Sequence, residues 1–197
     1  MSDYFAVFGL PRKLQVDEAE LRRRFYELSR RHHPDFHQLA ADHEQAAALA
    51  SSAEVNRAYR ALRDPLSRVE YLVALEEGRD GPGQPAHKPK PPMDLLAEMM
   101  EVQEALEEAR DAGLDAARER LAAERQRLIE RRAGTEAEIA RRGAAWDAAV
   151  EHGDNRVPLI AWFKEALAAR AYLRTVIDDL SDALGEDQDA HAPHRRH

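Results

Sequence analysis

The segment over residues 78–92 constrains the fold of this 197-residue chain more than any other feature. It reads GRDGPGQPAHKPKPP and holds five of the ten prolines. Proline lacks a backbone N–H and fixes φ, so no helix or central strand continues through such a density of proline and glycine. The sequence therefore predicts a linker over residues 77–92 between a first domain, residues 1–76, and a second domain, residues 93–186. A disordered tail is expected over residues 187–197.

Strong helix formers dominate the composition on both sides of this linker. Alanine supplies 36 residues and arginine 25, whereas β-branched residues are scarce. Because alanine, leucine, glutamate and arginine have high helix propensities, we expect an all-α protein. The first domain is interpreted as a helical hairpin with short flanking helices, and the second as an antiparallel three-helix bundle.

The charge and the absence of cysteine argue against several classes of function. The net charge is −8, and the acidity is concentrated in residues 93–188, which carry 13 basic and 22 acidic groups. A duplex-binding surface has to neutralise phosphates, so no nucleic-acid partner is expected. Without cysteine there is no disulfide scaffold and no thiolate metal site. No membrane-spanning stretch or signal peptide is visible, so we expect a cytoplasmic protein without a membrane partner.

Two antiparallel helices are expected in the first domain. Asp17 and Glu20 form a capping-box-like start to the first of them, and Leu21, Phe25 and Leu28 form its apolar stripe. The second helix is expected over residues 42–62. Its expected core face consists mostly of small residues: Ala46, Leu49, Ala50, Ala53 and Leu62, with Val55 and Tyr59 flanking it. Short helices are expected over residues 4–8 and after residues 64–65, where an aspartate and a proline form an N-cap and N1 pair.

The loop between the two helices opens with His33-Pro34-Asp35. A residue before proline avoids the α region, so Pro34 ends the preceding helix and makes the loop project rigidly. The Asp35 carboxylate is suited to a bidentate arginine from a partner, and the His33 ring offers two nitrogens for contact. An alternative is that Asp35 is only a turn residue.

The helix before this loop also carries arginines that lie mostly off its apolar stripe. They are Arg22, Arg23, Arg30 and Arg31. Such a basic face suits an acidic partner, although a merely solvated face is the alternative interpretation. The nearby His32, His33 and His37 do not predict a zinc site, because Pro34 disfavours the helix that would bring His33 and His37 onto one face.

The first helix of the second domain has apolar residues on two faces. A core seam repeats through Leu95, Met99, Val102, Leu106 and Ala109. A second stripe begins with apolar residues and continues into carboxylates: Leu96, Ala97, Met100, Glu101, Glu104 and Glu108. Methionine and leucine rimmed by carboxylates suit a recognition surface, while burial of this stripe stays open as the alternative. Paired catalytic carboxylates are not expected here, since no histidine lies among them.

These features together resemble the J-domain, whose signature is His-Pro-Asp and which stimulates ATP hydrolysis by DnaK-type chaperones. With the acidic bundle behind it, the chain is similar along most of its length to the HscB family of iron–sulfur co-chaperones. The residues that carry the resemblance are Asp3-Tyr4-Phe5, Phe8-Gly9-Leu10-Pro11, His33-Pro34-Asp35, Val55-Asn56, Ala58-Tyr59, Leu62, Asp64-Pro65-Leu66, Arg68, Glu70-Tyr71-Leu72, the acidic methionine-rich helix over 94–108 and Tyr172-Leu173.

The resemblance implies a co-chaperone and not an enzyme, with neither a cofactor nor a metal. Members of the family bind the scaffold protein IscU through the bundle and stimulate the DnaK-type ATPase HscA through the J-domain, which promotes maturation of iron–sulfur proteins. The implied chaperone-binding residues are His33, Pro34, Asp35, Arg22, Arg23, Arg30 and Arg31. The implied scaffold-binding residues are Leu96, Ala97, Met100, Glu101, Glu104, Glu108 and Tyr172. A J-domain protein whose bundle binds a different client stays open as the alternative.

Overall fold

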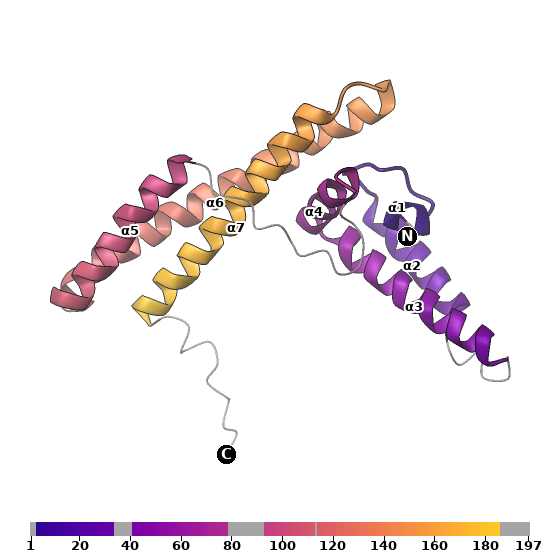
Figure 1. Cartoon of the computed structure of the whole chain (residues 1–197), viewed down its shortest axis with the longest axis horizontal. Coiled ribbons are helices and arrows are strands. Elements are labelled where there is room, and N and C mark those ends of the chain that lie inside the picture. Colours follow the sequence, from indigo (N-terminus) through magenta and orange to yellow (C-terminus); the bar gives the residue numbers. More distant parts are fainter. Residues whose placement is uncertain (1–2, 34–40, 79–92, 113, 186–197) are drawn as a thin grey trace, which may run out of the picture. The chain divides into compact units, whose positions relative to one another are not determined.

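The computed structural model describes residues 3–33, 41–78, 93–112 and 114–185. These residues form seven α-helices and no strand, which confirms the predicted all-α class (Figure 1). The helices are α1 (Tyr4–Val7), α2 (Glu18–Arg31), α3 (Asp42–Arg63), α4 (Pro65–Glu76), α5 (Met93–Ala112), α6 (Leu114–His152) and α7 (Val157–Leu184). The linker expected over residues 77–92 lies outside the described residues from residue 79 onward, and so does the tail expected over 187–197.

Two compact units can be distinguished, and they cut across the order of the chain. The first unit combines α1 to α4 with Ile139–Phe163, which comprises the end of α6, the turn after it and the start of α7. The second unit combines α5 with the rest of α6 and α7. Residues that follow the linker in sequence therefore take part in the packing of the first unit.

The hairpin of α2 and α3 forms the framework of the first unit, with α1 and α4 packed against α3 (Figure 1). The caps that the sequence predicts are present. The Asp17 carboxylate accepts hydrogen bonds from the N–H groups of Ala19, at 2.8 Å, and Glu20, at 3.1 Å. Asp64 accepts one from the N–H of Ser67 at 2.8 Å. These bonds satisfy amide groups that the first turn of a helix leaves without intrahelical partners.

The core face of α3 differs from the predicted one. Ala46, Leu49 and Ala50 are exposed, and the residues that α3 buries are Ala48, Val55, Ala58 and Leu62. Val55 and Leu62 are seven residues apart and share a side of the helix, and burying them removes more apolar area from water than burying alanines would. The predicted face is therefore wrong for Ala46, Leu49 and Ala50 and right for Leu62.

The core of the second unit lies where α5, α6 and α7 pack side by side (Figure 1). Leu95 and Val102 of the predicted seam belong to it, and Leu106 packs against it. Its buried residues are Leu95, Val102, Ala105, Leu121, Leu128, Leu173, Val176, Ile177, Leu180 and Leu184. The turn before α7 contains Gly153, which adopts a φ of 70° that few residues other than glycine tolerate.

Candidate functional site

The structure describes the helix that leads to the predicted partner-binding loop. α2 ends at Arg31, the N–H of His32 still donates to the carbonyl of Leu28 at 3.0 Å, and His33 is exposed. The helix thus ends directly before Pro34, as the restriction on residues that precede proline requires. Pro34 and Asp35 themselves lie outside the described residues, so their arrangement stays a prediction.

All four arginines of the predicted chaperone-binding site are exposed on α2, but they are not equivalent. The Arg23 guanidinium lies 3.2 Å from the Glu27 carboxylate and 3.8 Å from that of Glu20, which partly offsets its charge. Arg22 forms no hydrogen bond or ion pair with any described residue. Arg30 and Arg31 occupy the last turn of α2, where the negative end of the helix dipole stabilises cations. The face is therefore basic along its length.

Sequence reasoning did not single out Tyr26, which lies in the middle of this basic face. Its side chain is 64% exposed. It follows Arg22 by four residues and precedes Arg30 by four, so the three side chains share one side of α2. An aromatic ring beside guanidinium groups supplies contact area with little loss of side-chain entropy on binding. The exposure of Tyr26 could have been predicted from the sequence, because its position falls outside the apolar stripe of the helix.

A polar clamp fixes the loop that leads into α2. Within the described residues, Arg68 of α4 and Asp147 of α6 are the only buried charged side chains, and both hold the backbone of Leu14. Arg68 donates through Nε to the carbonyl of Leu62 at 2.7 Å and through Nη1 to the carbonyl of Leu14. The Asp147 carboxylate accepts from the N–H of Leu14 at 2.6 Å and from that of Gln15 at 2.8 Å.

Nearby carboxylates favour the charged form of Arg68. Burial lowers the pKa of the Arg68 guanidinium, and the carboxylates of Glu18, Asp64 and Asp147 counteract that shift. A buried arginine without such carboxylates nearby would be costly, since a charge taken out of water needs hydrogen bonds and opposite charges. The clamp therefore depends on residues from α2, α4 and α6 at once.

Two further contacts tie the same loop to the end of α6. The Trp146 ring is fully buried, and its Nε1 donates to the carbonyl of Arg12 at 2.8 Å. Lys13 forms an ion pair with Glu151; the hydrogen bond between them raises the pKa of Lys13 and lowers that of Glu151. No local pattern points to these contacts, because they join residues more than 130 positions apart.

The second stripe of α5 is exposed, which decides between the two interpretations that the sequence leaves open. Leu96 is 42% exposed and Met100 67%, and Glu101 and Glu104 are exposed as well. The side chains of Ala97 and Glu108 lie outside the described residues. Two large apolar side chains thus face solvent beside carboxylates, as expected for a surface that binds another protein.

Met93 extends this stripe toward the start of α5. It is 85% exposed, and it precedes Leu96 by three residues and Met100 by seven, so all three lie on one side of the helix. Sequence reasoning treated Met93 only as the start of the helix, although the same spacing identifies it. The apolar part of the stripe therefore covers at least two turns.

Tyr172 of α7 packs against α5. It is half-buried in a narrow apolar groove with Leu95, Glu98 and Val102, which belong to the core side of α5. Its hydroxyl is buried without a hydrogen-bond partner among the described residues, and burial raises the pKa of the phenol. The structure therefore places Leu96 and Met100 on one exposed side of α5 and packs Tyr172 against residues of its core side.

Comparisons with known proteins agree on both halves of the chain. The family model of the DnaJ domain matches residues 3–71, and the model of the HSCB C-terminal oligomerisation domain matches residues 91–152. Chaperone HscB from Vibrio cholerae is 25% identical, with coverage of 97% of this chain and 100% of that chain and a TM-score of 0.52. Human co-chaperone protein HscB is 27% identical, with coverage of 92% and 81% and a TM-score of 0.56. This chain belongs to the HscB co-chaperone family.

Family membership gives these surfaces a context. The DnaJ match contains all of α2, and the HSCB match contains all of α5. As an HscB-like J-domain protein, the chain is a co-chaperone of iron–sulfur protein assembly, whose partners are an Hsp70-type chaperone and a scaffold client. HscB-family co-chaperones are generally non-enzymatic. None of the described helices is long and apolar enough to cross a membrane.

Proposed function

We propose that this HscB-family protein binds an IscU-type scaffold through the exposed stripe of α5. We also propose that it stimulates ATP hydrolysis by a DnaK-type chaperone such as HscA through α2 and the His33-Pro34-Asp35 loop. The observation that carries the proposal is the exposure of Leu96 and Met100 beside carboxylates on α5. A J-domain needs no such surface for itself, so the stripe is best explained by a second partner.

α2 and the His33-Pro34-Asp35 loop act by binding the chaperone, and the chaperone itself binds and hydrolyses ATP. The exposed arginines of α2 attract an acidic surface of the chaperone and orient it. The Asp35 carboxylate then accepts a bidentate pair of hydrogen bonds from an arginine of the chaperone. Binding of this kind raises the ATPase rate by favouring the hydrolysis-competent conformation of the chaperone, to which the loop binds more tightly.

The test is the substitution Asp35→Asn, which keeps the size of the side chain and removes its charge. We expect it to abolish stimulation of the chaperone ATPase in a single-turnover assay, while the helical circular dichroism and the affinity for the scaffold stay at wild-type values. Asp42→Asn, at the exposed start of α3, is the matched control and should stimulate normally. Full stimulation by Asp35→Asn would contradict the proposal.

A further inference from the structure

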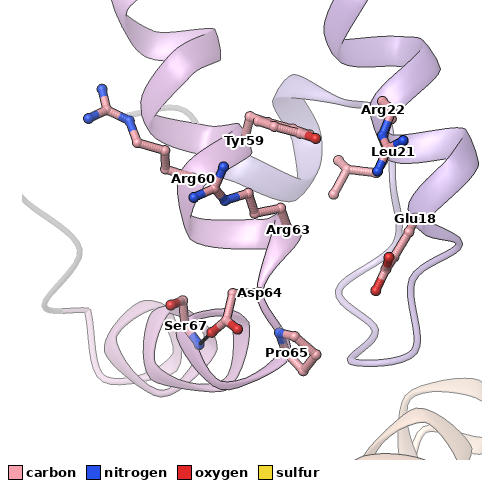
Figure 2. A pocket seen from close by; sticks show the side chains of 9 residues that line it. All are labelled: Glu18, Leu21, Arg22, Tyr59, Arg60, Arg63, Asp64, Pro65 and Ser67. Carbon is pink, nitrogen blue, oxygen red and sulfur yellow. Dashed lines mark hydrogen bonds between the residues drawn. The ribbon is translucent and has the colours of Figure 1, made fainter. Parts of the chain in front are cut away.

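A basic pocket opens at the end of the hairpin that is remote from the His33-Pro34-Asp35 loop (Figure 2). The start of α2, the end of α3 and the start of α4 line it, and it encloses about 570 Å³. Arg22 is the pocket residue of α2 closest to the last turn of that helix, and Arg31 follows it by nine positions. At 1.5 Å per residue, this stretch of helix is about 14 Å long. The pocket is therefore a feature distinct from the loop.

Three arginines line this pocket, and most of their guanidinium donors are unused. Arg22 and Arg63 form no hydrogen bond or ion pair with any described residue. Arg60 donates through Nε to the carbonyl of Asn56 at 3.3 Å, and its two terminal nitrogens have no partner in the described part of the chain. Figure 2 shows Tyr59 extending from α3 toward the side of α2 on which Arg22 lies. Unused guanidinium donors around a hollow indicate an anionic ligand.

The remaining lining favours a polypeptide over a free polyphosphate. Glu18 and Asp64 also line the pocket, and Asp64 uses one oxygen to cap Ser67, so only a small excess of positive charge remains. A compact polyphosphate would bring several negative charges close to these carboxylates, whereas an acidic segment spaces its carboxylates along a chain, so that each can pair with one guanidinium. Pro65 adds an apolar wall for the neighbouring part of a bound chain.

The pocket is continuous with the chaperone-binding face proposed above, because Arg22 belongs to both. We propose that the pocket is a second docking site for the chaperone, occupied by an acidic segment whose carboxylates pair with Arg60 and Arg63. This inference rests on the proposed function. The site holds the chaperone at the start of α2 while the loop acts at the other end, so it strengthens binding without taking part in the stimulation itself.

The decisive variant is the charge reversal Arg60→Glu with Arg63→Glu. Both side chains are exposed, so the fold should survive, which thermal unfolding will show. The matched control is Arg57→Glu with Arg174→Glu, which changes the net charge equally at two exposed arginines that do not line the pocket. We expect the pocket variant to raise the half-saturating concentration for ATPase stimulation about tenfold or more, with the maximal rate retained because Asp35 is intact. The control should stay near the wild-type value.

Each other outcome has a definite meaning. Equal half-saturating concentrations for the pocket variant and the control would overturn the inference while leaving the proposed function in place. Absence of stimulation by the wild-type protein would instead refute the proposed function. Calorimetric titration with pyrophosphate tests the competing ligand. Tight binding to wild type that is lost in the pocket variant, together with unchanged chaperone binding, would overturn the assignment to an acidic polypeptide.

Discussion

The proposed contact surfaces on α2 and α5 differ in their chemistry. α2 presents arginines around one exposed aromatic ring, whereas α5 presents exposed leucine and methionine beside carboxylates. Charges act over a Debye length of about 8 Å at physiological salt and mainly set association rates. Apolar side chains act only once water is displaced, and they mainly set dissociation rates. The chaperone contact should therefore be fast and sensitive to salt, and the scaffold contact slower to dissociate and tolerant of salt.

The largest effect is expected on the apolar side of this comparison. Leu96→Ala with Met100→Ala should weaken scaffold binding by roughly 2–4 kcal/mol, which is about 30-fold to 1,000-fold, because central apolar side chains carry most of an interface's free energy. Isothermal titration with the scaffold measures this loss, and stimulation of the chaperone without scaffold should be unchanged.

Val157→Ala is the control for that pair, since Val157 is also an exposed apolar residue and lies at the start of α7. If the Leu96/Met100 variant binds the scaffold with wild-type affinity, the stripe is not part of the binding surface.

A substitution in the polar clamp tests whether the surfaces on α2 and α5 depend on different parts of the structure. Asp147→Ala leaves the N–H groups of Leu14 and Gln15 without their acceptor. Buried unsatisfied groups cost about 1–3 kcal/mol, which corresponds to a fall in Tm of roughly 2–4 °C per kcal/mol for a domain of this size. We expect faster amide exchange at Leu14 and Gln15 and unchanged affinity for the scaffold. Asp154→Ala, in the exposed turn, is the control, and an unchanged Tm with unchanged exchange in the Asp147 variant would show that the clamp is unimportant.

The smallest effect concerns the electrostatic side. Arg22→Glu with Arg30→Glu should slow association with the chaperone about tenfold at low salt, because the field that attracts the acidic partner is reversed locally. In 1 M salt, where the Debye length is about 3 Å, the variant should approach the wild-type rate. Stopped-flow kinetics measure both rates, and the Arg57/Arg174 charge-reversal variant controls for net charge. An effect that does not depend on salt would indicate direct contacts instead of steering.

Local features of the structure were predictable, and contacts between remote segments were not. Pro34 predicts the end of α2, and the spacing of Leu95 and Val102 predicts the core side of α5, because both follow from one residue or one helical period. Whether Leu96 faces solvent depends on what packs around α5, which one helix cannot reveal. The hydrogen bond between Asp147 and Leu14 joins residues 133 positions apart, and no pattern within either segment predicts it.

The rotation of α3 shows a different limit. Leu49 is 61% exposed whereas Ala58 is fully buried, so residue size does not tell which side of this helix faces the core. The existence of the helix follows from its composition and spacing. Its rotation depends on the helices that pack against it, which no single segment reveals.

The central claim is that one chain couples two partners through separate surfaces. The most direct test is the single-turnover ATPase rate of the chaperone, measured with and without the scaffold for wild type, Asp35→Asn and the Leu96/Met100 alanine variant. We expect synergy between scaffold and wild type, no stimulation by Asp35→Asn, and scaffold-independent stimulation without synergy for the alanine variant. Equal synergy in wild type and the alanine variant would contradict the account.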